Sequence, residues 1–160
     1  LDKEIKDRRS EVTRQERRVT QREEAIEKLV DEIAKACPKN VIDPQKAKDS
    51  VFTREESMPT GLDHGLAVPH GRSDGVNHIV GAVAIVDNSE NENGSIPDYE
   101  MIDHSKLQFI VLTLVPTEGQ TPYLQLMAFI GRVMKAPDAS EQLLACKSAE
   151  DMRRFFQSTK

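Results

Sequence analysis

The first part of the chain repeats an apolar residue at a fixed interval. Five such residues follow one another seven positions apart: Ile5, Val12, Val19, Ile26 and Ile33. No glycine or proline occurs before Pro38, so the pattern predicts one long helix over residues 1–36. The second apolar column that a coiled coil requires is broken by Arg8, Gln15 and Arg22, which leaves a thin seam in the first half. The later turns carry a stripe wide enough to pack on a folded domain.

The rest of the chain alternates strand-like and helix-like patterns. Apolar runs predict strands over residues 65–69, 78–86 and 107–115, and the last two are apolar enough to be covered on both faces. A short strand near residues 99–102 is expected in the acidic loop between them. Amphipathic patterns predict helices over residues 47–52, 123–134, 140–145 and 149–156. Strands interleaved with helices indicate an α/β domain.

The length of 160 residues fits one compact domain preceded by additional helix. We expect a charged linker helix over residues 1–22 and a folded domain over residues 23–160. The net charge of −5 does not favour nucleic acid as a partner, and the arginine-rich stretch from Arg8 to Arg22 is typical of a solvated helix. The sequence begins at Leu1 within a helical pattern, so we expect it to be cut from a longer protein.

Two cysteines, Cys37 and Cys146, stand far apart and lack the spacing of a zinc site. They favour a reducing cytoplasm over a disulfide framework. No apolar run approaches the roughly 20 residues that cross a bilayer, and no signal peptide is visible. We predict no cofactor.

One segment, residues 54–72, differs from the rest in composition. The predicted strand ends at Pro69, and His70 follows it directly. Sites in α/β proteins tend to form where strands end. Pro69 fixes its own backbone, and Gly71 allows another backbone to approach closely. We therefore predict a rigid, partly open rim that presents the imidazole of His70, which is a good nucleophile near pH 7 when neutral.

This segment resembles the signature of the fructose/mannitol-type enzyme IIA domains (EIIA type 2) of the sugar phosphotransferase system. The matching stretches are Arg54-Glu55, Thr60-Gly61-Leu62 and Ala67-Val68-Pro69-His70-Gly71, and the resemblance extends from about residue 22 to the C-terminus. It implies the fold of these domains, a mixed β-sheet flanked by helices.

The resemblance also implies roles for two side chains. His70 would accept a phosphoryl group from the phosphocarrier protein HPr and pass it to an enzyme IIB partner. Arg54 would lie near that histidine and neutralise the charge of the phosphoryl group, which suits a reaction that depends on positioning and charge neutralisation.

Two positions depart from the family pattern. Tyr123 stands where many members carry a second histidine, and a tyrosine can donate a hydrogen bond to a phosphate but cannot act as a cation. Asp63 replaces the second glycine of the Thr-Gly-Ile-Gly stretch, and aspartate tolerates a positive φ better than most residues.

Five further residues are candidates for binding phosphate or for shaping the site: Thr60, Gly61, His64, Arg72 and Tyr123. For Thr60, a hydrogen bond in the site and a role in the turn are equal alternatives. Arg72 is alternatively a solvated loop residue. His64, Asp63 and His70 match no strong metal-binding spacing, so we predict no metal.

Two functions stay open. In the first, the domain is a phosphohistidine carrier, a phosphotransferase component that serves transport or its regulation. In the second, it is a non-catalytic regulatory domain fused to a membrane transporter such as a cation/proton antiporter or an amino-acid permease. Both place the domain in the cytoplasm, the second as the cytosolic part of an inner-membrane protein. A homodimer through the N-terminal helix is a further hypothesis.

Overall fold

The structure is a computed structural model that describes residues 21–38, 41–89, 94–118 and 121–158. It divides into two compact units, Leu1–Thr117 and Glu118–Lys160. A helix is present over residues 21–36, the last part of the helix predicted over residues 1–36, and the predicted first part lies outside the described residues. The boundary expected between residues 22 and 23 stays a prediction.

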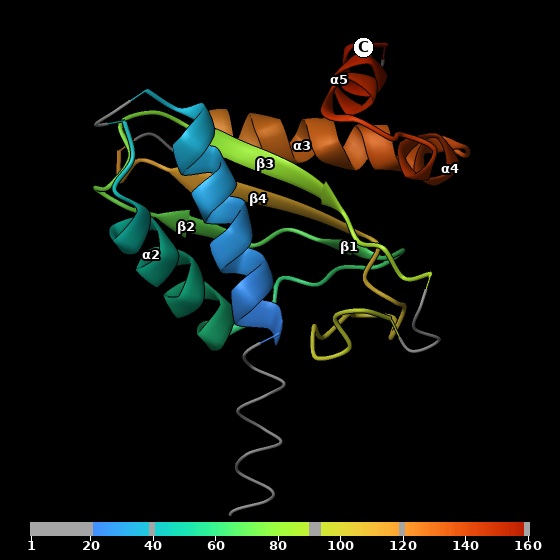
Figure 1. Ribbon diagram of the computed structural model, residues 1–160, viewed down its shortest axis with the longest axis horizontal. Helices are drawn as coiled ribbons and strands as arrows, with labels where there is room; N and C mark the ends of the chain where they lie inside the picture. Colours follow the sequence, from blue (N-terminus) through green and yellow to red (C-terminus); the bar gives the residue numbers. More distant parts are fainter. Residues whose placement is uncertain (1–20, 39–40, 90–93, 119–120, 159–160) are drawn as a thin grey trace, which may run out of the picture. The chain divides into compact units, whose positions relative to one another are not determined.

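The sheet of the first unit is built around β4 (Phe109–Val115). β3 (Val80–Ile85) pairs with it in antiparallel fashion along nearly its whole length. β1 (Leu66–Ala67) and β2 (His70–Arg72) pair with it in parallel. Since β3 occupies one edge of β4, the two short strands lie in succession along the other edge (Figure 1). The sheet is therefore mixed, as the family resemblance predicts.

β1 and β2 form one interrupted strand. Leu66 lies opposite Phe109 and His70 lies opposite Thr113, which is the same register on both sides of the break. Pro69 has no amide hydrogen to donate to the ladder, but its carbonyl oxygen accepts a hydrogen bond from the Thr113 amide at 3.0 Å. The predicted strand over residues 65–69 is thus wrong at its end, because pairing resumes at His70.

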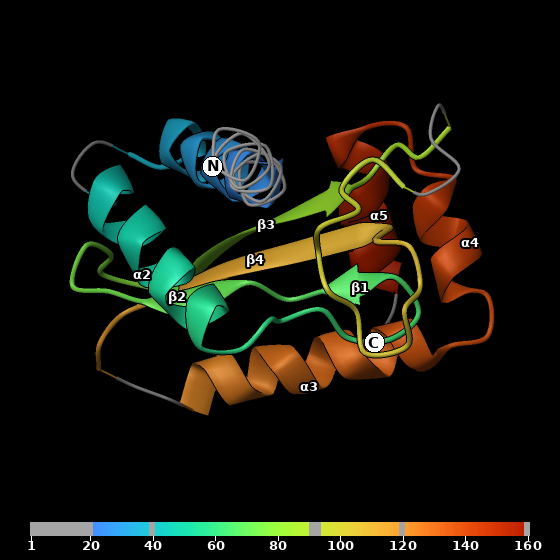
Figure 2. The same cartoon turned by 90° about the horizontal axis from the view of Figure 1, so that it is seen from below.

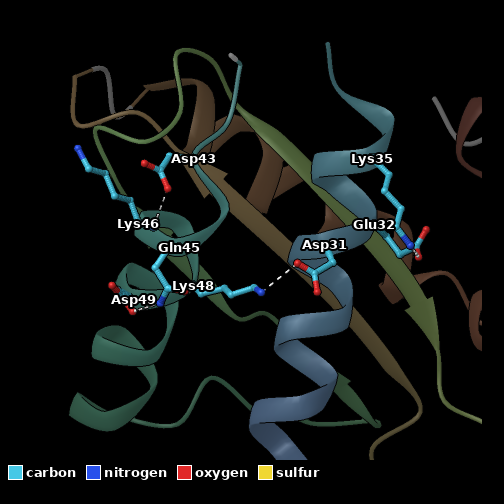
Figure 3. Close-up of polar contacts among 8 residues, drawn as sticks. All are labelled: Asp31, Glu32, Lys35, Asp43, Gln45, Lys46, Lys48 and Asp49. Carbon is cyan, nitrogen blue, oxygen red and sulfur yellow. Dashed lines mark hydrogen bonds and ion pairs between the residues drawn. The ribbon is translucent and has the colours of Figure 1, made fainter. Parts of the chain in front are cut away.

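Two helices cover one face of this sheet, the helix over residues 21–36 and α2 (Pro44–Ser57) (Figure 2). Their apolar side chains share a core with β4, made of Ile26, Val30, Ile33, Ala47, Val51, Leu112 and Leu114. An ion pair also joins the two helices, with 2.9 Å between Lys48 Nζ and Asp31 Oδ1 (Figure 3).

The helix α2 is much longer than the predicted helix over residues 47–52. It begins at Pro44, where a missing amide hydrogen costs nothing because the first turn has no acceptor for it. The Asp43 side chain caps this end by accepting a hydrogen bond from the Lys46 amide at 3.2 Å (Figure 3). The helix then continues through Arg54 to Ser57, so it carries the beginning of the signature segment.

The two long strands differ in burial. All seven residues of β4 are buried, as predicted, whereas every residue of β3 keeps some exposure. Full burial is therefore observed for β4, whereas β3 lies on an edge of the sheet and pairs with β4 alone among the described strands.

No strand forms near residues 99–102. Two turns take its place, closed by backbone hydrogen bonds from Tyr99 to Ile96 at 3.3 Å and from His104 to Met101 at 3.2 Å. Tyr99 and Met101 are nevertheless buried, in a second core cluster with Ala67, Leu107 and Ile110. The apolar residues here therefore anchor a loop rather than a strand.

The second unit contains α3 (Thr121–Lys135), α4 (Ala139–Leu144) and α5 (Ala149–Ser158), which confirms the three helices predicted there. Among the residues that the structure describes, no helix is long and apolar enough to cross a membrane.

At Gly71 the sheet packs directly against α2. A Cβ atom at this position would stand 2.8 Å from the backbone nitrogen of Val51 in α2. Gly71→Ala would push strand and helix apart, so we expect the free energy of unfolding, measured with urea, to fall by about 2 kcal/mol.

Gly131→Ala in α3 is the matched control for this substitution. A Cβ atom at Gly131 meets nothing within 4 Å, and alanine in a helix interior should raise the stability by about 0.5–1 kcal/mol. A Gly71→Ala protein as stable as the wild type would contradict the close approach of α2.

Candidate functional site

The chain between α2 and the sheet folds back on itself. The Leu62 amide donates to the Leu66 carbonyl at 2.8 Å, and the Val68 amide donates to the Thr60 carbonyl at 3.1 Å. Gly61 lies so close to another loop that an added Cβ atom would stand 2.9 Å from the carbonyl carbon of Glu100. The turn is thereby held between β1 and the loop over residues 94–107.

His70 is half-buried and opens β2. Its Nδ1 atom lies 3.0 Å from the carbonyl oxygen of Val68. A carbonyl oxygen can only accept, so Nδ1 carries the proton and the lone pair of the neutral ring resides on Nε2. The backbone therefore leaves Nε2 as the ring nitrogen that carries the lone pair of a neutral imidazole.

The register of β2 also decides which way the imidazole points. Gly71 faces α2, and its partner Leu114 belongs to the core beneath the two helices. Successive residues of a strand face opposite sides, so His70 and its partner Thr113 project from the other face of the sheet. Thr113 is buried there, and its hydroxyl has no hydrogen-bond partner among the described residues.

Arg54 lies in the last turn of α2, the helix that packs against β2 at Gly71. Its guanidinium donates a hydrogen bond to the Met58 carbonyl oxygen at 2.7 Å, which holds the C-terminal end of the helix. The helix and the strand that carry Arg54 and His70 are thus in contact. Neutralisation of a phosphoryl group by this arginine stays a prediction.

A buried polar cluster lies beneath the turn. The Glu55 carboxylate, only 2% exposed, accepts hydrogen bonds from the Tyr99 hydroxyl at 2.7 Å, from the Thr60 amide at 3.3 Å and from the Thr60 hydroxyl. The Thr60 hydroxyl also lies 2.9 Å from the Tyr99 oxygen. Burial, and then the charge of Glu55, raise the pKa of the Tyr99 hydroxyl above its ordinary value.

Sequence reasoning did not single out Glu55 or Tyr99 as members of the site. A signal for Glu55 was present, because it stands four residues after Val51 and eight after Ala47, on the buried stripe of α2. A carboxylate on an apolar stripe requires buried donors. Its partner Tyr99 is 44 residues away in the chain, so only the fold identifies it.

A comparison with known protein families shows to which family the chain belongs. The model of the family described as "Phosphoenolpyruvate-dependent sugar phosphotransferase system, EIIA 2" matches residues 8–159. The chain belongs to this family. The resemblance seen in the signature segment is thereby confirmed.

Relatives of this EIIA type 2 chain include proteins of sugar transport and of regulation. It is 28% identical over 132 residues to the fructose-specific EIIA component of Haloferax volcanii, with 82% of this chain and 80% of the relative covered. It is 24% identical over 125 residues to a nitrogen regulatory protein of Pseudomonas aeruginosa, covering 78% and 75%. It is 34% identical over 110 residues to the 2-O-alpha-mannosyl-D-glycerate-specific EIIABC component of Escherichia coli, covering 69% of this chain and 16% of that protein.

Solved structures show the same fold. The crystal structure of IIA mannitol from Escherichia coli matches with a TM-score of 0.62 at 17% identity, over 84% of this chain and 88% of that one. The structure of enzyme IIAMTL with phosphorylated enzyme IIBMTL from the same organism matches with a TM-score of 0.61 at 17% identity, over 85% and 87%. The mixed sheet flanked by helices is therefore a fold shared with EIIA domains.

The other candidate residues of this EIIA domain lie in different settings. Arg72 ends β2 with an exposed side chain. The His64 side chain is 83% exposed, with Nδ1 3.3 Å from Asp63 Oδ1. Tyr123 lies on α3 in the second unit, so its predicted place beside His70 stays a prediction. Within the described residues, no three His, Cys, Asp or Glu side chains are grouped to hold a metal ion.

The turn forms without the positive φ angle that was expected at Asp63. The positive φ angles fall on His64 and Gly65, at 56° and 78°, and not on Asp63. The carboxylate of Asp103 accepts a hydrogen bond from the His64 amide at 3.1 Å, which supports the left-handed residue. Gly65 has no room for a side chain, since an added Cβ atom would stand 2.9 Å from the Lys106 carbonyl oxygen.

The raised pKa of Tyr99 predicts a loss of stability in alkali. Above about pH 10 the tyrosine ionises in the unfolded chain while it stays protonated in the folded one, so the unfolded state is favoured. This contribution is complete below pH 10 and falls by at most about 1.4 kcal/mol per pH unit above it. Urea unfolding at pH 8 and pH 11 should show a smaller loss for Tyr99→Phe than for the wild type. Equal losses would contradict the burial of the hydroxyl.

Proposed function

We propose that this EIIA domain carries a phosphoryl group on Nε2 of His70. The observation that supports the proposal is the contact of 3.0 Å between Nδ1 and the Val68 carbonyl oxygen, because it directs the lone pair to Nε2. The donor would be the phosphohistidine of HPr, and the acceptor an enzyme IIB-like protein. The solved complex of enzyme IIAMTL with phosphorylated enzyme IIBMTL, a structure of the same fold, supports an acceptor of this kind.

The transfer step follows from the tautomer. The Nε2 lone pair attacks phosphorus and forms a new P–N bond, while the P–N bond of the donor breaks and its electron pair returns to the donor imidazole. The ring of His70 gains positive character, which strengthens the Nδ1–H hydrogen bond to Val68 O. Arg54 supplies positive charge for the transferred group from the end of α2, which requires that it leave the Met58 carbonyl or share its donors with it.

Domain organisation belongs to the same proposal. We propose that a long charged helix over residues 1–22 connects the EIIA domain to further protein, with the domain in the cytoplasm. The chain covers only 16% of the mannosylglycerate-specific EIIABC relative, so the same type of domain does occur within a larger transport component. Pairing of two such helices in a homodimer is compatible with this organisation.

A second function, a non-catalytic regulatory domain attached to a membrane transporter such as a cation/proton antiporter or an amino-acid permease, is favoured by one observation. Tyr123 replaces the second histidine of many family members and removes a potential cation. The relatives of this chain include a nitrogen regulatory protein as well as a sugar-specific EIIA component, so a regulatory function has a precedent among them. In this function the His70 region would bind a ligand or partner without turnover.

Labelling decides between the two functions. Incubation with enzyme I, HPr and labelled phosphoenolpyruvate should give an acid-labile label on the wild type and none on His70→Gln, which lacks the nucleophilic nitrogen. His78→Gln is the matched control, because His78 is an exposed histidine bonded to its neighbour Asn77. A wild-type protein without label rules out the phosphocarrier and leaves the regulatory function.

Tyr123→His tests the missing second histidine. If its replacement limits transfer, an added imidazolium should raise the rate from phosphorylated HPr about fivefold, because a charged hydrogen bond is worth roughly 1 kcal/mol more than a neutral one. Rapid-quench kinetics would measure this rate, with Tyr123→Phe as the control for the hydroxyl itself. An unchanged rate would show that Tyr123 is not limiting.

A further inference from the structure

The buried carboxylate beneath the turn is connected to His70 through a continuous series of hydrogen bonds. Glu55 holds Thr60 by its amide at 3.3 Å and by its hydroxyl, and the Tyr99 hydroxyl holds Glu55 at 2.7 Å. Three parts of the first unit thus meet at one carboxylate: the end of α2, the turn after it and the loop over residues 94–107.

The series continues from Thr60 to the imidazole. The Thr60 carbonyl accepts a hydrogen bond from the Val68 amide at 3.1 Å, and the Val68 carbonyl accepts one from Nδ1 of His70 at 3.0 Å. Val68 is therefore held at both its amide and its carbonyl. The sheet holds the next residue, because the Pro69 carbonyl accepts a hydrogen bond from the Thr113 amide, and the turn holds Val68 in the gap between β1 and β2.

We propose that Glu55, Thr60 and Tyr99 are positioning residues that hold His70 in the Nδ1–H tautomer through the backbone of Val68. All three residues are buried, with at most 4% of their surface exposed. The Thr60 hydroxyl is bonded to Glu55 and Tyr99, and the side chain is only 4% exposed, so it acts on the turn and does not bind phosphate. The inference rests on the proposed function, because it concerns the histidine that would carry the phosphoryl group.

The chemical consequence concerns which ring nitrogen carries a lone pair. When the turn loosens, the Val68 carbonyl moves and the proton exchanges between Nδ1 and Nε2. His70 rings that carry the proton on Nε2 lack the lone pair that would attack phosphorus at that nitrogen. A small displacement of the ring also lowers the rate, since misplacement of about 1 Å can cost about a hundredfold.

The direct test is the pattern of ¹⁵N chemical shifts from the His70 ring in unphosphorylated protein, assigned by comparison with His70→Gln. The wild type should show a pyrrole-like Nδ1 and a pyridine-like Nε2. Tyr99→Phe and Thr60→Val, which remove single hydroxyls at nearly constant volume, should move both signals toward the averaged values of an exchanging ring. Thr60→Ser keeps the hydroxyl and should restore the wild-type pattern.

Kinetics provide a second measurement. Transfer from phosphorylated HPr should lose about tenfold in kcat for Tyr99→Phe and Thr60→Val, with little change in the KM for phosphorylated HPr, because the docking surface is intact. Val30→Ala is the control for lost stability, since Val30 is fully buried in the other core cluster, whose members include none of Glu55, Thr60 and Tyr99. It should lower stability and leave the ring signals unchanged.

Each outcome has one meaning. Wild-type ring signals in both Tyr99→Phe and Thr60→Val overturn the positioning role, and so does an equal shift of the signals in Val30→Ala. If Tyr99→Phe does not fold, the comparison of Thr60→Val with Thr60→Ser carries the test. A wild-type protein that accepts no phosphoryl group disproves the proposed function, while the ring signals still decide whether the cluster holds the tautomer.

Discussion

Parallel pairing of residues 66–72 with β4 is the constraint on which the site depends. Both segments of this interrupted strand keep one register across Pro69. That register directs Gly71 toward α2 and His70 toward the opposite face, so a slip by one residue would exchange the two. The imidazole would then point at the helix, and no close packing of α2 would form. The direction of the His70 side chain and the packing of α2 are therefore set by the same ladder.

Pro69 has two consequences that act together. Its missing amide hydrogen removes one donor from the ladder next to the histidine, while its carbonyl oxygen still accepts a hydrogen bond from the Thr113 amide. The turn over residues 60–68 then holds that backbone by its own hydrogen bonds, with Glu55 at their origin. A buried carboxylate costs several kcal/mol unless donors surround it, and here an amide and two hydroxyls do so. Such a cluster is rigid because the loss of any donor leaves a buried charge with fewer partners.

Elements with a strong local residue pattern are predictable from the sequence, whereas elements that depend on contacts with distant segments are not. The strands over residues 80–85 and 109–115 were predictable because a continuous run of apolar, mostly β-branched residues favours a buried strand. The predicted helix over residues 47–52 covers only part of α2, which begins at Pro44 because the first helical position tolerates proline. Residues 99–102 resembled a strand since Tyr99 and Met101 are apolar and alternate, yet both are buried in a loop that lacks a strand partner.

Two properties were determined by the sequence alone. The stretch from Ala67 to Gly71 identified the candidate histidine, because a proline, a histidine and a glycine in that order constrain the backbone locally, and the resemblance of this signature segment indicated the family that the family model shows. The apolar runs determined that the domain is α/β. Three others were decided only by the tertiary structure: the face from which His70 projects, the tautomer that the Val68 carbonyl selects, and the partnership of Glu55 with Tyr99. The physical reason is that each of these depends on hydrogen bonds or register between segments brought together by folding, and such contacts leave no periodic signal along the chain.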